Sequence, residues 1–551
     1  MWSHCCPQAF DPDVDGHLLP PPPHRPRGRT PGIQHLMLLL GLVAAGAVQA
    51  QVPALPPTEA PLPGEVPSPQ LPAVTPEIIA IPPVPERGTE EMDSLVLEVK
   101  GFRLRGAQDH LRQGLRVSDL QALLEQRRQE RQGRFGIFEL EELADEITRY
   151  YRDKGFVVAK AFVPVQDVAD GVVEITVLEG RLGSVTIERE AGRYREQRLL
   201  APFAGQTGRT VHKDRLEGAL LTLRDYPGLD ATGVFRPGEA TGDTDLVLRI
   251  EPERRFAGGL RLDNHGSQLS GEWRLRGDLI WNNPTNHADL LAVSLLHTFD
   301  PNNSLFGSVD YQLPVWRPGT LIGAGASRND FDVGGEFREL DITGVSEIAE
   351  VYVAHNVIRS RPRNLTGRLG FSRKNANTEQ NGMEFSQDTV AVLDLTVSGD
   401  FIDPFKGINL GFIRYSRGLG GVLDALDSDG DPSSSRQGGS GDFAGGDFDK
   451  VELSYTRLQS LPDVLFRNQS LLLRFFGQWS DDLLVSLEQL SIGGADSVRA
   501  YPRTEFLRDK GFFASLEWIV PAPGFADKTA FRNLRWGQVF QAPLFVDYAR
   551  G

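Results

Sequence analysis

The C-terminal half of the chain, residues 254–551, consists of segments of roughly ten residues in which apolar and polar positions alternate. Asn, Asp, Gly and Pro separate these segments. The apolar residues that share a face are Leu291, Val293, Leu295 and Phe299 in one segment, Leu305, Val309, Tyr311 and Leu313 in the next, and Leu471, Leu473, Phe475 and Trp479 in a later one, where Arg474 and Gln478 face the other way. A soluble sandwich also has one apolar face, but about eleven such segments precede Leu490, too many for a single sandwich. The pattern therefore favours a transmembrane antiparallel β-barrel.

Residues 94–253 have a different pattern, in which segments with helical periodicity are followed by segments with strand-like alternation. A helix is predicted within residues 135–156, because Ile137, Leu140, Leu143, Ile147 and Tyr150 recur at spacings of three and four and Gly155 follows them. Two alternating strands follow, at 156–165 and 171–180. The order then repeats, with strands at 182–190, 229–237 and 243–253 and a helix whose face carries Leu216, Leu220 and Leu223. Two α+β modules of similar plan are expected.

The N-terminal part of the chain has the features of a targeting segment and a spacer. Arg25, Arg27 and Arg29 precede an apolar run from Leu36 to Val48, which is too short to span a bilayer. With the small residues before Gln51, this pattern indicates a secretory signal peptide, the alternative being a buried helix. Gln51–Glu86 contains 12 prolines, which favour an extended periplasmic spacer or a disordered tail.

Composition narrows the classes of function. The 551-residue chain has a net charge of −16 and a pI near 5.2, which argues against nucleic-acid binding, because phosphate contacts need a basic face. Its two cysteines, Cys5 and Cys6, precede the signal peptide, so the mature protein has no disulfide framework.

The motifs of common enzymes are missing from the sequence, and no histidines lie at the spacing of metal ligands. Asp427, Asp429 and Asp431 suggest a calcium loop, but Pro432 and Gly438 stand where an EF-hand needs Gly and Glu. A solvated surface loop is preferred. No enzyme activity, cofactor or metal site is expected.

Five regions follow from these patterns. They are an over-long N-terminus with signal peptide (1–50), a Pro-rich periplasmic linker (51–93), a first module (94–180), a second module (181–253) and the barrel (254–551).

Two stretches carry a family resemblance. "ITRYYRDKGFVVAKAFVPVQDVADGVVEITVLEGRLG" resembles a polypeptide-transport-associated (POTRA) domain, and "IGGADSVRAYP" resembles a loop motif usually written Val-Arg-Gly-aromatic. With the signal peptide and the barrel, they make the chain similar to two-partner secretion transporters of the hemolysin secretion/activation and filamentous-hemagglutinin-transporter type. Members have POTRA modules followed by a 16-stranded barrel. About 13 strands are visible here, so three are expected to be missing at the C-terminus.

The resemblance implies roles for particular residues. The loop motif corresponds to Val498, Arg499, Ala500 and Tyr501, with Ala500 where Gly is usual. It implies that this loop folds into the barrel and that Arg499 pairs with Asp547 on the inner wall. From the residues alone, a solvated loop arginine is the alternative. Gly493, Gly494, Asp509 and Gly511 correspond to the loop and to the start of the following strand.

The resemblance also implies a partner and a location. The chain would sit as a monomer in outer-membrane lipid of a Gram-negative-type bacterium, with its modules in the periplasm, and would export a large β-rich exoprotein that has an N-terminal two-partner-secretion domain. The partner is expected to add a strand to an exposed sheet edge of the first module, at Phe156, Val157, Val158, Ala159, Phe162 and Val163. The alternatives are an outer-membrane protein assembly insertase of the same superfamily, which would carry more POTRA modules, and an enzymatic barrel.

Overall fold

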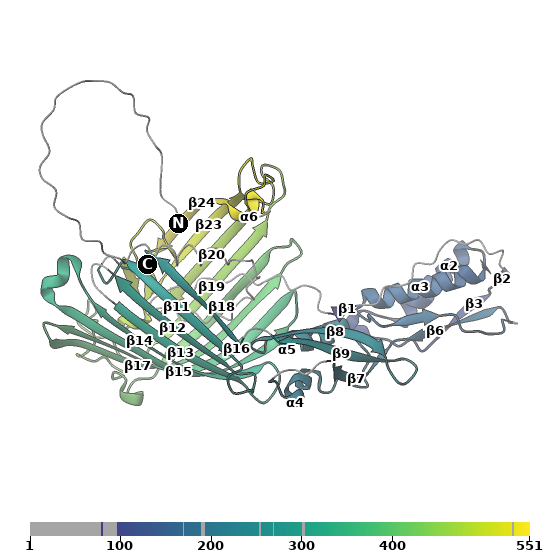
Figure 1. Ribbon diagram of the computed structural model, residues 1–551, viewed down its shortest axis with the longest axis horizontal. Coiled ribbons are helices and arrows are strands. Elements are labelled where there is room, and N and C mark those ends of the chain that lie inside the picture. Colours follow the sequence, from purple (N-terminus) through teal and green to yellow (C-terminus); the bar gives the residue numbers. More distant parts are fainter. Residues whose placement is uncertain are drawn as a thin grey trace, which may run out of the picture. The chain divides into compact units, whose positions relative to one another are not determined.

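The computed structural model describes residues 79–80, 96–168, 170–188, 193–252, 255–267, 269–299, 304–531 and 534–551 (Figure 1). The predicted signal peptide and most of the Pro-rich segment lie outside these residues. Along the described chain, two α/β units precede one large antiparallel sheet. None of the helices in these ranges is long and apolar enough to cross a bilayer.

The first α/β unit packs two helices, α2 (Val117–Glu130) and α3 (Ile137–Asp153), with a three-stranded sheet in the order β3-β6-β5. The central strand β6 pairs in parallel with β3 and antiparallel with β5. The remaining bounds are β2 (Leu97–Glu98), β3 (Gly101–Arg105), η1 (Leu111–Gln113), β4 (Arg134–Phe135), β5 (Lys160–Phe162) and β6 (Val172–Leu178).

The core of this unit confirms the predicted helix face in part. Leu140, Leu143 and Ile147 of α3 are buried. The prediction is wrong for Ile137, which is exposed as the first residue of the helix. It is also wrong for Tyr150, which is only half-buried: spacings of three and four from Ile147 fit Tyr150 and Tyr151 equally, and Tyr151 is the fully buried one.

The strand predicted at 156–165 is shorter in the structure, where β5 covers only Lys160–Phe162. A turn precedes it, in which the Ala159 N–H donates to the carbonyl oxygen of Phe156. Helix α2 was not predicted, because only Leu120 and Leu124 of its residues are buried, too few to give a clear period.

The second α/β unit has a four-stranded sheet in the order β1-β8-β9-β7, covered by α5. Leu216, Leu220 and Leu223 of α5 are buried, as the spacing predicts. Strand β1 (Ile79–Ala80) comes from the Pro-rich segment expected to be a spacer. The other bounds are β7 (Arg181–Ile187), α4 (Glu196–Leu200), η2 (Ala201–Phe203), α5 (Lys213–Arg224), β8 (Leu229–Pro237) and β9 (Asp243–Pro252).

The large sheet has 13 strands in the order β10-β11-β12-β13-β14-β15-β16-β17-β18-β19-β20-β23-β24. Every neighbouring pair is antiparallel, and the last two strands follow a long loop, as expected. The bounds are β10 (Phe256–Asp263), β11 (Trp273–Asn282), β12 (Leu290–Phe299), β13 (Ser304–Pro314), β14 (Thr320–Asp332), β15 (Ile342–Arg359), β16 (Arg363–Gln380), β17 (Met383–Ile402), β18 (Ile408–Gly418), β19 (Asp449–Ser460), β20 (Ser470–Trp479), β23 (Gly511–Pro521) and β24 (Gln541–Arg550), with η3 (Gly335–Leu340) and η4 (Val422–Asp424) in the loops.

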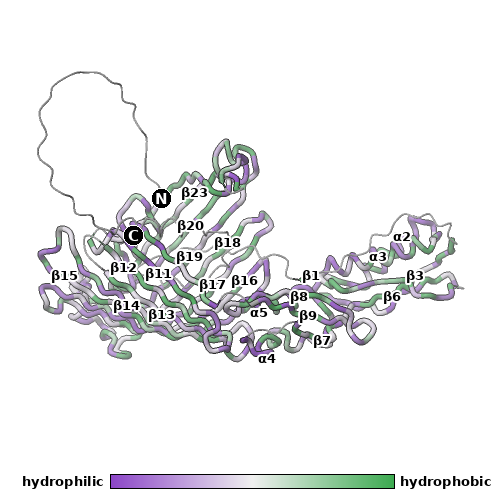
Figure 2. Tube along the Cα trace, in the orientation of Figure 1, coloured by the Kyte–Doolittle hydropathy of each residue, from purple (hydrophilic) through white to green (hydrophobic). Residues whose placement is uncertain are grey.

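The two faces of this sheet differ in polarity. In β12, Leu295 is 59 % exposed whereas Ser294 and Thr298 are buried. In β20, Trp479 is exposed and Gln478 is buried. Figure 2 shows polar and apolar residues alternating along these strands. An exposed apolar outer face and a polar inner face are those of a transmembrane barrel.

The last strand of the sheet follows a short helix. Trp536–Val539 forms α6, and β24 begins at Gln541. The Gln538 side chain accepts a hydrogen bond from the Arg535 N–H, which caps this helix.

Candidate functional site

The loop between β20 and β23, residues 480–510, folds back onto the inner face of the sheet. It contains η5 (Ser486–Glu488) and a hairpin of β21 (Leu490–Ile492) and β22 (Phe506–Arg508). Gly493 and Gly494 follow β21 with φ of 118° and 92°. A Cβ at Gly493 would lie 2.2 Å from the carbonyl oxygen of Pro502, so only glycine permits this turn. The motif Val498–Tyr501 lies in the connection between the two strands.

Arg499 makes a dense set of contacts with the sheet. Its Nε and Nη2 donate to the two oxygens of Asp547 at 2.9 and 2.8 Å, and its backbone N–H donates to Asp547 Oδ2 at 3.1 Å. Nη1 donates to Glu517 Oε2 at 2.7 Å, and Nη2 also donates to Ser515 Oγ at 3.0 Å. The structure thus brings together Arg499 and Asp547, in the bidentate geometry that suits a guanidinium and a carboxylate.

Strand register explains why these wall residues converge. Ser515 of β23 pairs with Arg474 of β20 on one side and with Asp547 of β24 on the other. Glu517 lies two residues further along β23 and therefore on the same face. Glu517 and Ser515 were missed by sequence reasoning, although the alternation along β23 could have placed them on the inner face.

The surroundings of Arg499 are also suited to a cation. The guanidinium carbon lies 3.5 Å from the centre of the Phe545 ring, two residues before Asp547. Arg474 adds a second positive charge in the same row, so two arginines face two carboxylates. Because the charges balance, the loop can remain partly buried there without a net charge out of water.

An apolar cluster holds the same loop from its other side. Leu490, Ile492 and Val498 of the loop pack with Phe476 of β20 and Phe513 of β23. All five are buried. Phe476 and Phe513 are apolar residues on the otherwise polar inner face of the sheet, and they would be exposed to water if the loop did not cover them. These apolar residues therefore favour the inward position of the loop.

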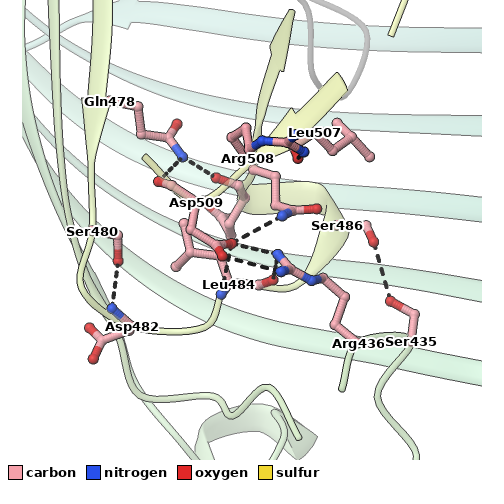
Figure 3. A network of polar contacts seen from close by, with 12 residues as sticks. Ser435, Arg436, Gln478, Ser480, Asp482, Leu484, Ser486, Leu507, Arg508 and Asp509 are labelled. Carbon is pink, nitrogen blue, oxygen red and sulfur yellow. Dashed lines mark hydrogen bonds and ion pairs between the residues drawn. The ribbon is translucent and has the colours of Figure 1, made fainter. Parts of the chain in front are cut away.

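A second polar network joins the ends of the loop to the neighbouring loop between β18 and β19 (Figure 3). Asp509 accepts hydrogen bonds from Arg436 Nη1 at 2.5 Å and Nη2 at 3.1 Å. It also accepts from the Leu484 N–H and from Gln489 Nε2. Asp509, which was predicted to lie at the start of the strand after the loop, therefore connects the loop between β20 and β23 with the loop between β18 and β19.

A third contact lies where η5 meets the wall. Glu488 is 1 % exposed and pairs with Lys374 of β16 at 2.6 Å and with Lys450 of β19 at 2.7 Å. Burial by itself would raise the pKa of Glu488, but the charges of Lys374 and Lys450 and their hydrogen bonds outweigh it and lower the pKa to about 2. The carboxylate is therefore ionised at all physiological pH values.

The other residues of the motif play smaller parts. Ala500 is exposed, and Tyr501 is half-exposed, with its ring edge-on to Phe506. A Cβ at Gly511 would lie 2.6 Å from the carbonyl oxygen of Arg550, which explains a glycine at the start of β23.

The six residues expected to recognise a partner lie in two settings. Phe156, Val157 and Ala159 are buried, and the Phe156 ring packs between His110 and His212, at centroid distances of 4.5 and 5.2 Å. Val158, Phe162 and Val163 are half-buried. The first group therefore belongs to the core and to the contact between the two α/β units, and only the second group reaches the surface.

Among the described residues, no three His, Cys, Asp or Glu side chains are grouped to hold a metal ion.

Comparison with known proteins places this geometry in a family. Residues 242–542 match the family model for haemolysin secretion/activation protein ShlB/FhaC/HecB, and residues 98–180 match the ShlB-type POTRA domain. The heme/hemopexin transporter protein HuxB of Haemophilus influenzae (strain 86-028NP) is 25 % identical over 416 residues, which are 75 % of this chain and 70 % of that protein. The outer membrane transporter CdiB of Dickeya dadantii (strain 3937) is 24 % identical over 402 residues, 70 % of this chain and 68 % of that protein.

A solved structure, CdiB from Escherichia coli, has a similar fold, with a TM-score of 0.59 at 22 % identity, over 80 % of this chain and 78 % of that one. The family model covers more than half of the 551 residues. The chain therefore belongs to the ShlB/FhaC/HecB family of haemolysin secretion/activation proteins, the outer-membrane transporters of two-partner secretion.

Proposed function

We propose that this chain exports one unfolded, β-rich protein through its barrel, with the inward loop as the part that responds to transport. The observation that carries this proposal is the contact of Arg499 with Asp547 and Glu517 on the inner wall. We propose that the loop has two arrangements, one held on the wall by its polar contacts and apolar cluster and one released during transport. Such a two-state element is what a gated pore needs.

The division of labour follows the chain order. The two α/β units, proposed to span 94–180 and 181–253, would capture the partner in the periplasm, and the barrel from 254 would pass it outward. We propose that the chain works as a monomer in outer-membrane lipid and without enzymatic chemistry or nucleic-acid binding. The family membership supports the pore, and the net charge of −16 argues against nucleic acid.

A secretion assay separates this function from barrel assembly. In cells that lack the chain, one large exoprotein should disappear from the surface while the levels of other outer-membrane proteins stay unchanged. A general loss of barrel proteins would contradict the proposal and support an assembly insertase. Only two α/β units are described, and the relatives reported above are transporters, which favours secretion.

Recognition at the first unit is proposed for the edge of β5. β5 is the last strand of its sheet, and its one outward N–H, at Ala161, donates to Thr148 Oγ1 of α3 at 2.9 Å. An added strand would have to compete with this hydroxyl. The half-buried side chains Phe162 and Val163 would then supply the apolar contact with the partner.

Replacing Phe162 with serine is expected to lower partner secretion about threefold or more, since burial of an aromatic contact contributes about 1–2 kcal/mol to such docking. The matched control is Val165→Ser, because Val165 is fully exposed just beyond the strand. Both are scored by the exoprotein in the medium relative to the chain in the membrane. Equal secretion by the two variants would move recognition away from β5.

A further inference from the structure

The loop between β18 and β19, residues 419–448, contains the acidic run 427–431, which the proposed function does not use. β10 follows the second α/β unit, and the strands of the sheet alternate in direction. The ninth and eleventh strands of the sheet, β18 and β20, therefore both end on the side away from the α/β units. With these units in the periplasm, this acidic loop and the inward loop, residues 480–510, both begin at the outer end of the barrel.

The acidic loop is solvated only in part. Asp427 and Asp429 are exposed, as the sequence suggested. On either side of them the loop is buried, because it packs against both β17 and the inward loop. The apolar cluster consists of Leu426, Ala444 and Phe448 of the acidic loop, Val390 and Val392 of β17, and Leu484 and Val485 of the inward loop.

A buried carboxylate of the barrel wall holds the same loop. Asp388 of β17 is 2 % exposed and lies on the inner face, because the exposed Leu393 and Leu395 lie on the other face. It accepts hydrogen bonds from Ser434 Oγ at 2.8 Å, from the Ser435 N–H at 3.1 Å and from Ser435 Oγ. Three donors from two consecutive loop residues satisfy a carboxylate that is shielded from water, so the acidic loop is fixed to the wall at this point.

The acidic loop is joined to the inward loop at the next residue. Arg436 donates to Asp509 and to the carbonyl oxygen of Leu484, both of the inward loop (Figure 3). Ser435 Oγ also lies 3.3 Å from Ser486 Oγ. Because adjacent residues bind the wall and the inward loop, displacement of one loop breaks contacts of the other.

We propose that residues 419–448 form a lid over the outer end of the pore, that Asp388 holds this lid closed, and that the lid and the inward loop open together through the contact of Arg436 with Asp509. The inference rests on the proposed function and deepens it. It gives the pore a second moving part and makes Asp388 a positioning residue of the closed state.

Trypsin reports the release of the lid, because Arg436 is the only lysine or arginine in the sequence between Arg417 and Lys450. Asp388→Ala removes the acceptor of three hydrogen bonds. Trypsin added to intact cells should then cut after Arg436 about tenfold or more faster than in the parent, since the loop must open locally before it is cut. The inward loop should also be cut faster, and the single-channel conductance should rise about twofold or more.

Asp429→Ala is the matched control, because it removes an exposed aspartate from the same loop, and it should behave as the parent. The double change Ser434→Ala with Ser435→Ala removes the donors and leaves β17 intact. It should reproduce Asp388→Ala, which guards against damage to the strand.

Three outcomes would overturn the proposal. Unchanged cutting after Arg436 in both variants would show that Asp388 does not hold the loop. Faster cutting at parental conductance would show that the loop is not a lid. Parental protection of the inward loop would show that the two loops open independently. None of these measurements needs a secreted partner, and a chain that forms no pore would show no channels in any variant, so failure of the lid is distinct from failure of the proposed function.

Discussion

With alanine in place of Arg499, the chain is expected to reach the outer membrane at normal levels and to secrete its partner about tenfold or more less efficiently. The substitution leaves Asp547 and Glu517 facing each other without the guanidinium between them. Breaking a buried ion pair costs about 3–5 kcal/mol, because the remaining charge stays uncompensated. The Arg499 side chain is 21 % exposed, so the lower end of that range applies. Even a cost of about 3 kcal/mol exceeds the roughly 1.4 kcal/mol that changes the equilibrium between the held and the released loop tenfold.

Arg508→Ala is the matched control for this experiment. Arg508 lies in the same loop, is exposed, and donates to the carbonyl oxygen of its neighbour Leu507. It should secrete normally. Arg499→Lys should fall between the two, since lysine keeps the charge but lacks the planar fork. Secretion is measured as exoprotein in the medium per unit of folded chain. Parental secretion by Arg499→Ala would remove the loop from the mechanism.

Much of the fold was accessible from the sequence because its signals are local. Strand alternation needs only neighbouring residues, so the 13 strands and the two α/β units emerged from pattern alone. Local signals fail where two neighbouring residues fit the helical spacing equally well. Tyr150 and Tyr151 both fit the buried face of α3, but Tyr151 is the buried one, and its hydroxyl donates a hydrogen bond to Glu179, which is distant in the sequence.

The candidate site was accessible only in part. Arg499 and Asp547 came from a resemblance, since 48 residues separate them and no period connects them. Glu488 and Lys374 are 114 residues apart, and each looks like any charged residue on a polar face. Their pairing depends on how the loop folds back, a property of the whole sheet. The same holds for the strand-like run that starts at Phe156. The Phe156 ring packs between His110 and His212, which lie far from it along the chain, and β5 covers only Lys160–Phe162.

Glu488→Gln is expected to loosen the loop and to widen the pore. Glutamine keeps the size of the side chain but leaves the charges of Lys374 and Lys450 without their common partner. Lys450 is 7 % exposed, so its charge cannot be hydrated in place, and it retains the longer ion pair with Glu452, at 3.9 Å. A cost at the lower end of the range for a broken buried pair, about 3 kcal/mol, is therefore expected. The segment around η5 should detach from β16 and β19. Single-channel recordings in planar bilayers should then show a conductance about twofold or more above the parent, and protease should cut the loop faster.

The pH dependence of this contact gives the sharper test. The pKa of Glu488 is lowered from 4.5 to about 2, so its stabilising contribution is complete above pH 4.5 and is lost only as the pH falls toward 2. The conductance of the parent should therefore be the same at pH 5.5 and pH 8, and the difference from Glu488→Gln should persist at both. Glu505→Gln, a change at an exposed glutamate of the same loop, should match the parent. If Glu488→Gln also matched the parent, the buried charges would not hold the loop, and the gate would have to rest on Arg499 and Asp509.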